Sequence, residues 1–180
     1  TTNNYSSAQR VPYGSASPKY FGGLTNTFSY RGFTLEAQFN YQFGNYVQDT
    51  WAGYYLGAGF NPGFNKVRRI LDRWQKPGDL TGVPKYIYGG NKSFQSFSTF
   101  YLFKGDFIRL RNIQVGYDIP KTLLSKAKIS SAFLYVRGTN LWTWVKDKDL
   151  SFDPEQGVSS QTNLDVLIPK TMTIGINLGF

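Results

Sequence analysis

The sequence contains the stretch Lys170-Thr-Met-Thr-Ile-Gly-Ile-Asn-Leu-Gly-Phe180, in which apolar and polar residues alternate. Its apolar residues occupy the even positions, and they are Met172, Ile174, Ile176, Leu178 and Phe180. The odd positions between them carry threonine, glycine or asparagine. Because successive side chains of a β-strand point to opposite faces, this period of two predicts a strand with one apolar and one small or polar face.

The stretch from residue 33 to residue 44 shows the same period most regularly. Its apolar positions are Phe33, Leu35, Ala37, Phe39, Tyr41 and Phe43, and the positions between them are all polar. The apolar face carries no charge, and the length is close to the roughly ten residues with which a tilted strand crosses a bilayer. The pattern therefore favours a transmembrane strand whose apolar side faces lipid.

Further stretches with this alternation cover residues 22–31, 105–119 and 129–144. Arg31-Gly32 supplies a tight hairpin turn, because glycine permits the positive φ that such a turn needs. Within 105–119 the apolar positions change parity near Arg111-Asn112, which predicts a β-bulge. We therefore expect an all-β chain with about five antiparallel strands, the last of them over 170–180.

Long irregular segments separate these strands, and they cover residues 1–21, 44–104 and 145–169. By contrast, the turn at Arg31-Gly32 and the connection 120–128 are short. Outer-membrane barrels have short periplasmic turns and long external loops, so we expect the long segments outside and the chain's end in the periplasm. The aromatic residues expected at the membrane interfaces are Tyr30 and Phe33 on the inner side and Trp142 and Trp144 on the outer side.

Five strands are too few to close a membrane barrel, because the smallest has about eight. An open sheet in lipid would leave backbone groups unpaired at its edges. We therefore expect the remaining strands to come from a preceding part of the polypeptide or from a partner chain. The polar start Thr1-Thr-Asn-Asn also resembles the interior of a loop, without the pattern of a signal peptide.

The composition excludes several classes of function. The chain has no cysteine and no histidine, which removes thiol chemistry and the commonest general base and metal ligand. Serine is plentiful but lacks a nucleophile-elbow motif, so we predict that the chain is not an enzyme. The net charge of +9 is scattered over loops and matches no nucleic-acid-binding motif, so we expect no nucleic acid partner.

A series of segments carries a family resemblance. The segments are Pro18-Lys-Tyr-Phe-Gly-Gly-Leu-Thr-Asn-Thr-Phe-Ser-Tyr-Arg-Gly-Phe33, Leu71-Asp-Arg-Trp74 with Pro84, Gly105-Asp-Phe-Ile-Arg-Leu-Arg-Asn-Ile-Gln-Val-Gly-Tyr117 with Pro120, Asn140-Leu-Trp-Thr143 with Asp153-Pro-Glu155, and the stretch that ends at Phe180. In this order they resemble the C-terminal region of SusC/RagA-type TonB-dependent outer-membrane transporters.

The resemblance implies the last strands of a barrel of about 22 strands in the outer membrane of a Gram-negative bacterium. Such a transporter imports oligosaccharides or oligopeptides beneath a SusD-like surface lipoprotein that acts as a lid, and TonB energises it. The plug domain and the segment that contacts TonB are absent from this chain. The resemblance also implies contact with membrane lipid and lipopolysaccharide, and recognition of the even-numbered face of the 170–180 strand by the barrel-assembly machinery.

Aromatic residues of the 44–104 segment are candidates for contact with the substrate or the lid. They are Trp51, Tyr54, Tyr55, Phe60, Phe64 and Trp74. Aromatic rings stack on sugars and hold peptide side chains, but they also pack a loop against itself. Both interpretations fit the sequence.

Charged clusters in the loops offer weaker candidates. The spacing of Asp147, Asp149, Asp153 and Glu155 suggests a Ca²⁺ loop, although the glycine and the terminal glutamate of an EF-hand are missing. A solvated acidic loop is the alternative, and no other cofactor is expected. The basic residues Lys66, Arg68, Arg69 and Arg73 are expected to face water on a helical turn within 65–74, with attraction of an anionic ligand or lipopolysaccharide as the alternative.

Two other functions fit the strand pattern. A soluble β-sandwich carbohydrate-binding module would pack the apolar strand faces against a second sheet, and it would fold without detergent. A passive outer-membrane pore would keep the barrel but lack a preceding plug domain.

Overall fold

The computed structural model describes residues 4–125, 128–155, 161–162 and 167–180. The chain forms two compact units that interleave in sequence. The sheet unit comprises Pro18–Gly44, Asp106–Lys146 and Leu167–Phe180. The loop unit comprises Thr1–Ser17, Asn45–Gly105 and Asp147–Val166.

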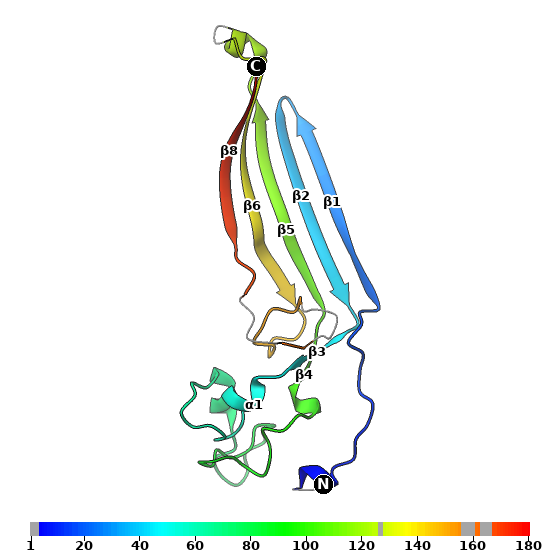
Figure 1. Cartoon of the computed structure of the whole chain (residues 1–180), viewed down its shortest axis with the longest axis vertical. Coiled ribbons are helices and arrows are strands. Elements are labelled where there is room, and N and C mark those ends of the chain that lie inside the picture. The colour runs from blue at the N-terminus through cyan, green and yellow to red at the C-terminus, as the bar shows by residue number, and fades with distance from the viewer. Residues whose placement is uncertain (1–3, 126–127, 156–160, 163–166) are drawn as a thin grey trace. The chain divides into compact units, whose positions relative to one another are not determined.

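The sheet unit is one antiparallel sheet of five strands. The strands are β1 (Tyr20–Tyr30), β2 (Phe33–Phe43), β5 (Phe107–Asp118), β6 (Ser131–Val145) and β8 (Thr171–Gly179). Their order in the sheet is β1-β2-β5-β6-β8, so they lie side by side in the order of the sequence (Figure 1). Each strand begins and ends within two residues of the range expected from the alternation. The predicted antiparallel β-structure is thus confirmed, and a short helix, α2 (Lys121–Leu124), follows β5.

The turn and the bulge expected from the sequence are both present. Arg31 and Gly32 have φ values of 47° and 85°, as a tight type I′ hairpin turn requires. In the pairing of β2 with β5, the neighbours Gln38 and Phe39 face Asn112 and Leu110. Arg111 is therefore the extra residue of a β-bulge, and it explains the change of parity along β5.

A second irregularity lies in β6, where the sequence shows no change of parity. Leu110 and Asn112 of β5 pair with Trp142 and Thr139 of β6, so β6 contains one more residue than β5 at this point. Relative to β2, β5 therefore has one added residue and β6 has two. Two added residues restore the original parity, which is why the alternation of β6 appears uninterrupted in the sequence. Asn140, inside this irregularity, has a φ of 55°.

The loop unit contains short elements around a small core. They are η1 (Tyr5–Ser7), β3 (Tyr46–Asp49), α1 (Ala52–Tyr55), η2 (Arg68–Asp72), η3 (Thr99–Tyr101), β4 (Leu102–Lys104) and β7 (Gln161–Thr162). The three short strands form a sheet in the order β4-β3-β7. The core consists of Ala52, Leu56, Ile70, Val83 and Tyr101. Among the described residues, no helix has the length and hydrophobicity needed to cross a membrane.

Candidate functional site

One face of the five-stranded sheet is apolar and exposed to solvent. The register aligns apolar side chains into rows across all five strands, and one such row is Phe28, Leu35, Val115, Val136 and Ile174. The side chains of this row remain between 39% and 76% exposed. A contiguous apolar face of this kind marks a surface that meets a protein or a membrane. It is not the packed face that a β-sandwich would need.

The aromatic residues expected at the membrane interfaces lie at the two ends of this apolar face. Tyr30 pairs with Phe33 across the hairpin turn. Trp142 and Trp144 lie at the other end of the sheet, where they pair with Leu110 and with a further apolar residue of β5. All four aromatic side chains are at least 36% exposed.

The opposite face of the sheet is polar and makes its own hydrogen bonds. Arg137 donates from Nε and Nη2 to the Gln114 side-chain oxygen at 2.9 and 2.7 Å. The Asn112 amide donates to the Gln38 side-chain oxygen at 2.8 Å, and the Thr139 hydroxyl is 3.3 Å from the Asn112 oxygen. These cross-strand pairs fix the side chains of the polar face, which is suited to contact with water.

The loop unit brings four of the six predicted aromatic contact residues together. This aromatic cluster consists of Trp51, Tyr54, Phe60 and Phe64. Tyr54 lies at its centre, with ring centroids 5.1 Å from Trp51, 5.9 Å from Phe60 and 5.7 Å from Phe64. The Phe64 side chain is 55% exposed. Partly exposed rings at these separations form a surface that can hold an apolar or ring-shaped group.

The other two predicted aromatic residues lie elsewhere. Tyr55 packs against the core of the loop unit, and its ring centroid is 6.0 Å from that of Phe152. Trp74 donates its backbone N–H to Val83 at 2.9 Å, and the Lys85 ammonium is 6.0 Å from its ring. For Tyr55, packing within the loop unit is therefore the better interpretation.

Lys66 supports the backbone of the aromatic cluster. Its ammonium donates to the backbone oxygens of Phe60 and Asn61 at 2.9 Å each, and also to that of Tyr54. Burial lowers the pKa of Lys66. The expectation that Lys66 faces water was therefore wrong, because three carbonyl groups replace its hydration. The neighbouring Arg73 also donates to a backbone oxygen, that of Ile70, at 3.5 Å.

The four acidic residues considered for Ca²⁺ do not converge. Asp147 and Asp153 each accept a hydrogen bond from the backbone N–H two residues further on, at 3.2 and 2.9 Å. Asp149 forms an ion pair with Arg69 at 3.3 Å. Within the described part of the chain, no group of three or more Asp and Glu side chains could hold a metal ion.

Asp49 is a buried acid of the loop unit, with 2% of its surface exposed. Its Oδ1 accepts the Trp51 N–H at 3.0 Å and lies 3.3 Å from the Thr162 hydroxyl. Burial raises the pKa of Asp49 above its ordinary value of 3.8, although these hydrogen bonds oppose the shift. Burial also raises the pKa of Tyr101, and the charge of Asp49 contributes to that shift.

Replacing Asp49 with asparagine should stabilise the loop unit at neutral pH, because it keeps the Oδ1 acceptor and removes a buried charge. A carboxyl group whose pKa is higher in the folded state contributes stability below its unfolded-state pKa. This contribution is lost as the pH rises through the folded-state value. The advantage of the variant should therefore disappear below about pH 3.8. Hydrogen exchange of the Trp51 amide at several pH values measures this, and equal protection at neutral pH would contradict it.

Comparison with known proteins shows homology to TonB-dependent receptors. It is 30% identical over 149 residues to TonB-dependent receptor P39 of Formosa agariphila, which covers 82% of this chain and 14% of that protein. It is 25% identical over 184 residues to TonB-dependent receptor P3 of the same organism, which covers 97% of this chain and 18% of that protein. No family model matches.

The same relationship is found among solved structures. The RagAB peptide importer in its closed-closed state matches with a TM-score of 0.78 and 29% identity, over 93% of this chain and 18% of that chain. Its open-open state matches with a TM-score of 0.77 and 28% identity, over 91% and 17%. The chain thus spans less than a fifth of the relatives that it matches.

These relatives are receptors and importers rather than enzymes, which agrees with the prediction of a non-catalytic chain. TonB-dependent receptors are proteins of the outer membrane. The chain is homologous to TonB-dependent receptors and to RagA of the SusC/RagA family, and it corresponds to a segment of such a transporter.

Proposed function

We propose that this chain is the C-terminal part of the β-barrel of a TonB-dependent outer-membrane importer of oligopeptides. The observation that carries the proposal is the row of apolar side chains that runs across all five strands and stays exposed. A lipid-facing barrel wall requires such a face, with a polar face toward the lumen. The strands are 9 to 15 residues long, and about 9–11 residues suffice for a tilted strand to cross a bilayer.

The edges of the sheet support closure by further strands. β1 and β8 each pair on one side only within the described residues. In lipid these edges need partners, which the rest of the same transporter would provide, together with its plug. The exposed even-numbered face of β8 fits the proposed recognition by the barrel-assembly machinery. In this arrangement the aromatic residues Tyr30, Phe33, Trp142 and Trp144 lie at the two membrane interfaces, and the end of β8 faces the periplasm.

The comparisons support a cargo and partners for this proposal. The matched solved structures are those of a peptide importer, which favours oligopeptides over oligosaccharides as the cargo. Homology to TonB-dependent receptors favours energised import over a passive pore. We place the loop unit outside the cell, where its aromatic cluster contacts the peptide or a SusD-like lipoprotein lid.

Replacing Tyr54 with alanine should weaken peptide binding by about tenfold, because Tyr54 holds the other three rings of the aromatic cluster together. Tyr88→Ala is the matched control, because Tyr88 is 83% exposed and lies outside the cluster. The measurement is the affinity of the intact, detergent-purified transporter for a set of short synthetic peptides and, in parallel, for a set of oligosaccharides. Loss of oligosaccharide binding with unchanged peptide binding would assign a glycan cargo instead. If neither changes, the cluster only packs the loop unit.

A further inference from the structure

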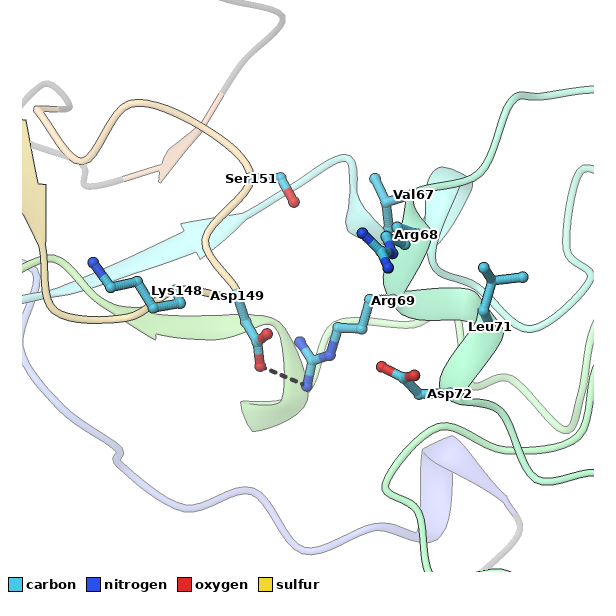
Figure 2. A pocket seen from close by; sticks show the side chains of 8 residues that line it. All are labelled: Val67, Arg68, Arg69, Leu71, Asp72, Lys148, Asp149 and Ser151. Atoms are coloured by element: carbon cyan, nitrogen blue, oxygen red, sulfur yellow. Dashed lines mark ion pairs between the residues drawn. The ribbon is translucent and has the colours of Figure 1, made fainter.

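A pocket of about 470 Å³ lies in the loop unit between η2 and residues 148–151 (Figure 2). Three cationic side chains line it, and they are Arg68, Arg69 and Lys148. Two carboxylates, those of Asp72 and Asp149, also line it, so cations are in excess. Its volume is within the range of about 300–1,000 Å³ that is typical of small-ligand sites, and it suits part of a peptide better than a whole one.

The Phe100 ring holds the Arg69 side chain in this pocket. Its guanidinium lies over the Phe100 ring, 4.9 Å from the centroid. Nη2 contacts the Asp149 carboxylate at 3.3 Å, whereas Nη1 is buried and has no hydrogen-bond partner within the described part of the chain. A guanidinium can bind a carboxylate with two parallel N–H bonds, and the ion pair with Asp149 uses only one nitrogen.

Asp149 is an exchangeable partner for Arg69. Its side chain is 55% exposed, and that of Arg69 is 27% exposed. Ion pairs with this much solvent contact contribute little to stability, so a better-placed carboxylate can displace Asp149 at small cost. Arg68 and Lys148 increase the positive potential that such a group would meet.

We infer that this pocket binds a carboxylate group of the imported peptide, with Arg69 as the principal contact in exchange for Asp149. The peptide class rests on the proposed function, whereas the carboxylate preference rests on the pocket itself. A C-terminal carboxylate and an acidic side chain share this chemistry. Because the guanidinium is already oriented by Phe100, binding requires reorientation of the exposed Asp149 side chain rather than of Arg69.

The test measures binding of matched synthetic peptides to the intact transporter. The first pair of peptides differs only at the C-terminus, which is free in one and amidated in the other. Both peptides of the second pair are amidated, and one carries a glutamate where the other has glutamine. The wild type should prefer the carboxylate forms by about tenfold. Arg69→Gln should abolish this preference. Asp149→Asn should increase the preference, because it frees the guanidinium.

Two further variants separate recognition from folding. Arg69→Lys keeps the charge but loses the two-nitrogen geometry, so it should retain only part of the preference. Arg73→Gln is the matched control, because Arg73 lies one turn away and does not line this pocket. An unchanged preference in both Arg69→Gln and Asp149→Asn would overturn the carboxylate site while the peptide cargo stands. If no peptide binds the wild type, both the cargo and the site are overturned.

Discussion

Replacing Ile176 with arginine should prevent the transporter from accumulating in the outer membrane, whereas Asn177→Arg should be tolerated. The two residues are neighbours in β8, but they belong to opposite faces of the sheet. Ile176 pairs with Leu134 on the apolar face and is 53% exposed, and Asn177 pairs with Phe133 on the polar face. An arginine that faces lipid near the middle of a barrel strand costs about 2–4 kcal/mol, whereas a lumen-facing arginine remains in water.

The measurement is the amount of folded transporter in outer-membrane fractions, detected by the shift in gel mobility between unheated and heated samples. Both variants add the same side chain and the same charge, so general effects of arginine on translation or export cancel in the comparison. Wild-type levels of folded Ile176→Arg would contradict the lipid-facing assignment of the apolar face. Loss of both variants would instead indicate that β8 tolerates no large residue on either face.

The long strands could be predicted from the sequence because the apolar side chains of each strand gather on one face. In β2 and β8 an unbroken period of two specifies which side chains share a face, and a slip by one residue would exchange the faces. The same logic revealed the bulge at Arg111, because a single added residue changes the parity. It could not reveal the irregularity around Asn140, because the second added residue restores the parity.

The loop unit could not be predicted in the same way, because its contacts join residues that are distant in sequence. Its strands are only two to four residues long, too short to show a period. β3 pairs with β7 through Gln48 and Gln161, which lie 113 positions apart. The environment of Lys66 is set by three nearby backbone carbonyl groups, and backbone groups carry no residue type by which the sequence could signal them.

Two charged residues show how the structure changes the interpretation of a basic cluster. Lys66 and Arg69 are three positions apart and were expected to face water together. The structure shows the Lys66 ammonium bound by backbone oxygens, whereas Arg69 has one buried nitrogen without a partner in the described residues. The two cations therefore have different roles. Lys66 fixes the backbone of the aromatic cluster, and Arg69 is the residue to which we assign the proposed carboxylate site.

Replacing Gly59 with alanine should disrupt the loop unit and abolish peptide binding, while the transporter still assembles in the membrane. Gly59 has a φ of 101°, and a Cβ added there would lie 1.8 Å from the Ile87 backbone oxygen. Its carbonyl accepts the Gly89 N–H at 3.1 Å, and Phe60 of the aromatic cluster follows directly. Because backbone rather than a flexible side chain causes the clash, relief requires this pairing to break, at a cost of about 3 kcal/mol or more.

Gly63→Ala is the matched control for this prediction. Gly63 lies in the same segment, no φ in the left-handed region constrains it, and an added Cβ would meet no atom within 4 Å. Limited proteolysis and hydrogen exchange of residues 45–105 should therefore show opening in Gly59→Ala and none in Gly63→Ala. Folded transporter at wild-type levels in both variants would separate this result from that of Ile176→Arg. Gly59 affects binding only through the structure of the loop unit. If Gly59→Ala opens the loop unit and the transporter still binds peptide with full affinity, peptide binding does not involve the aromatic cluster.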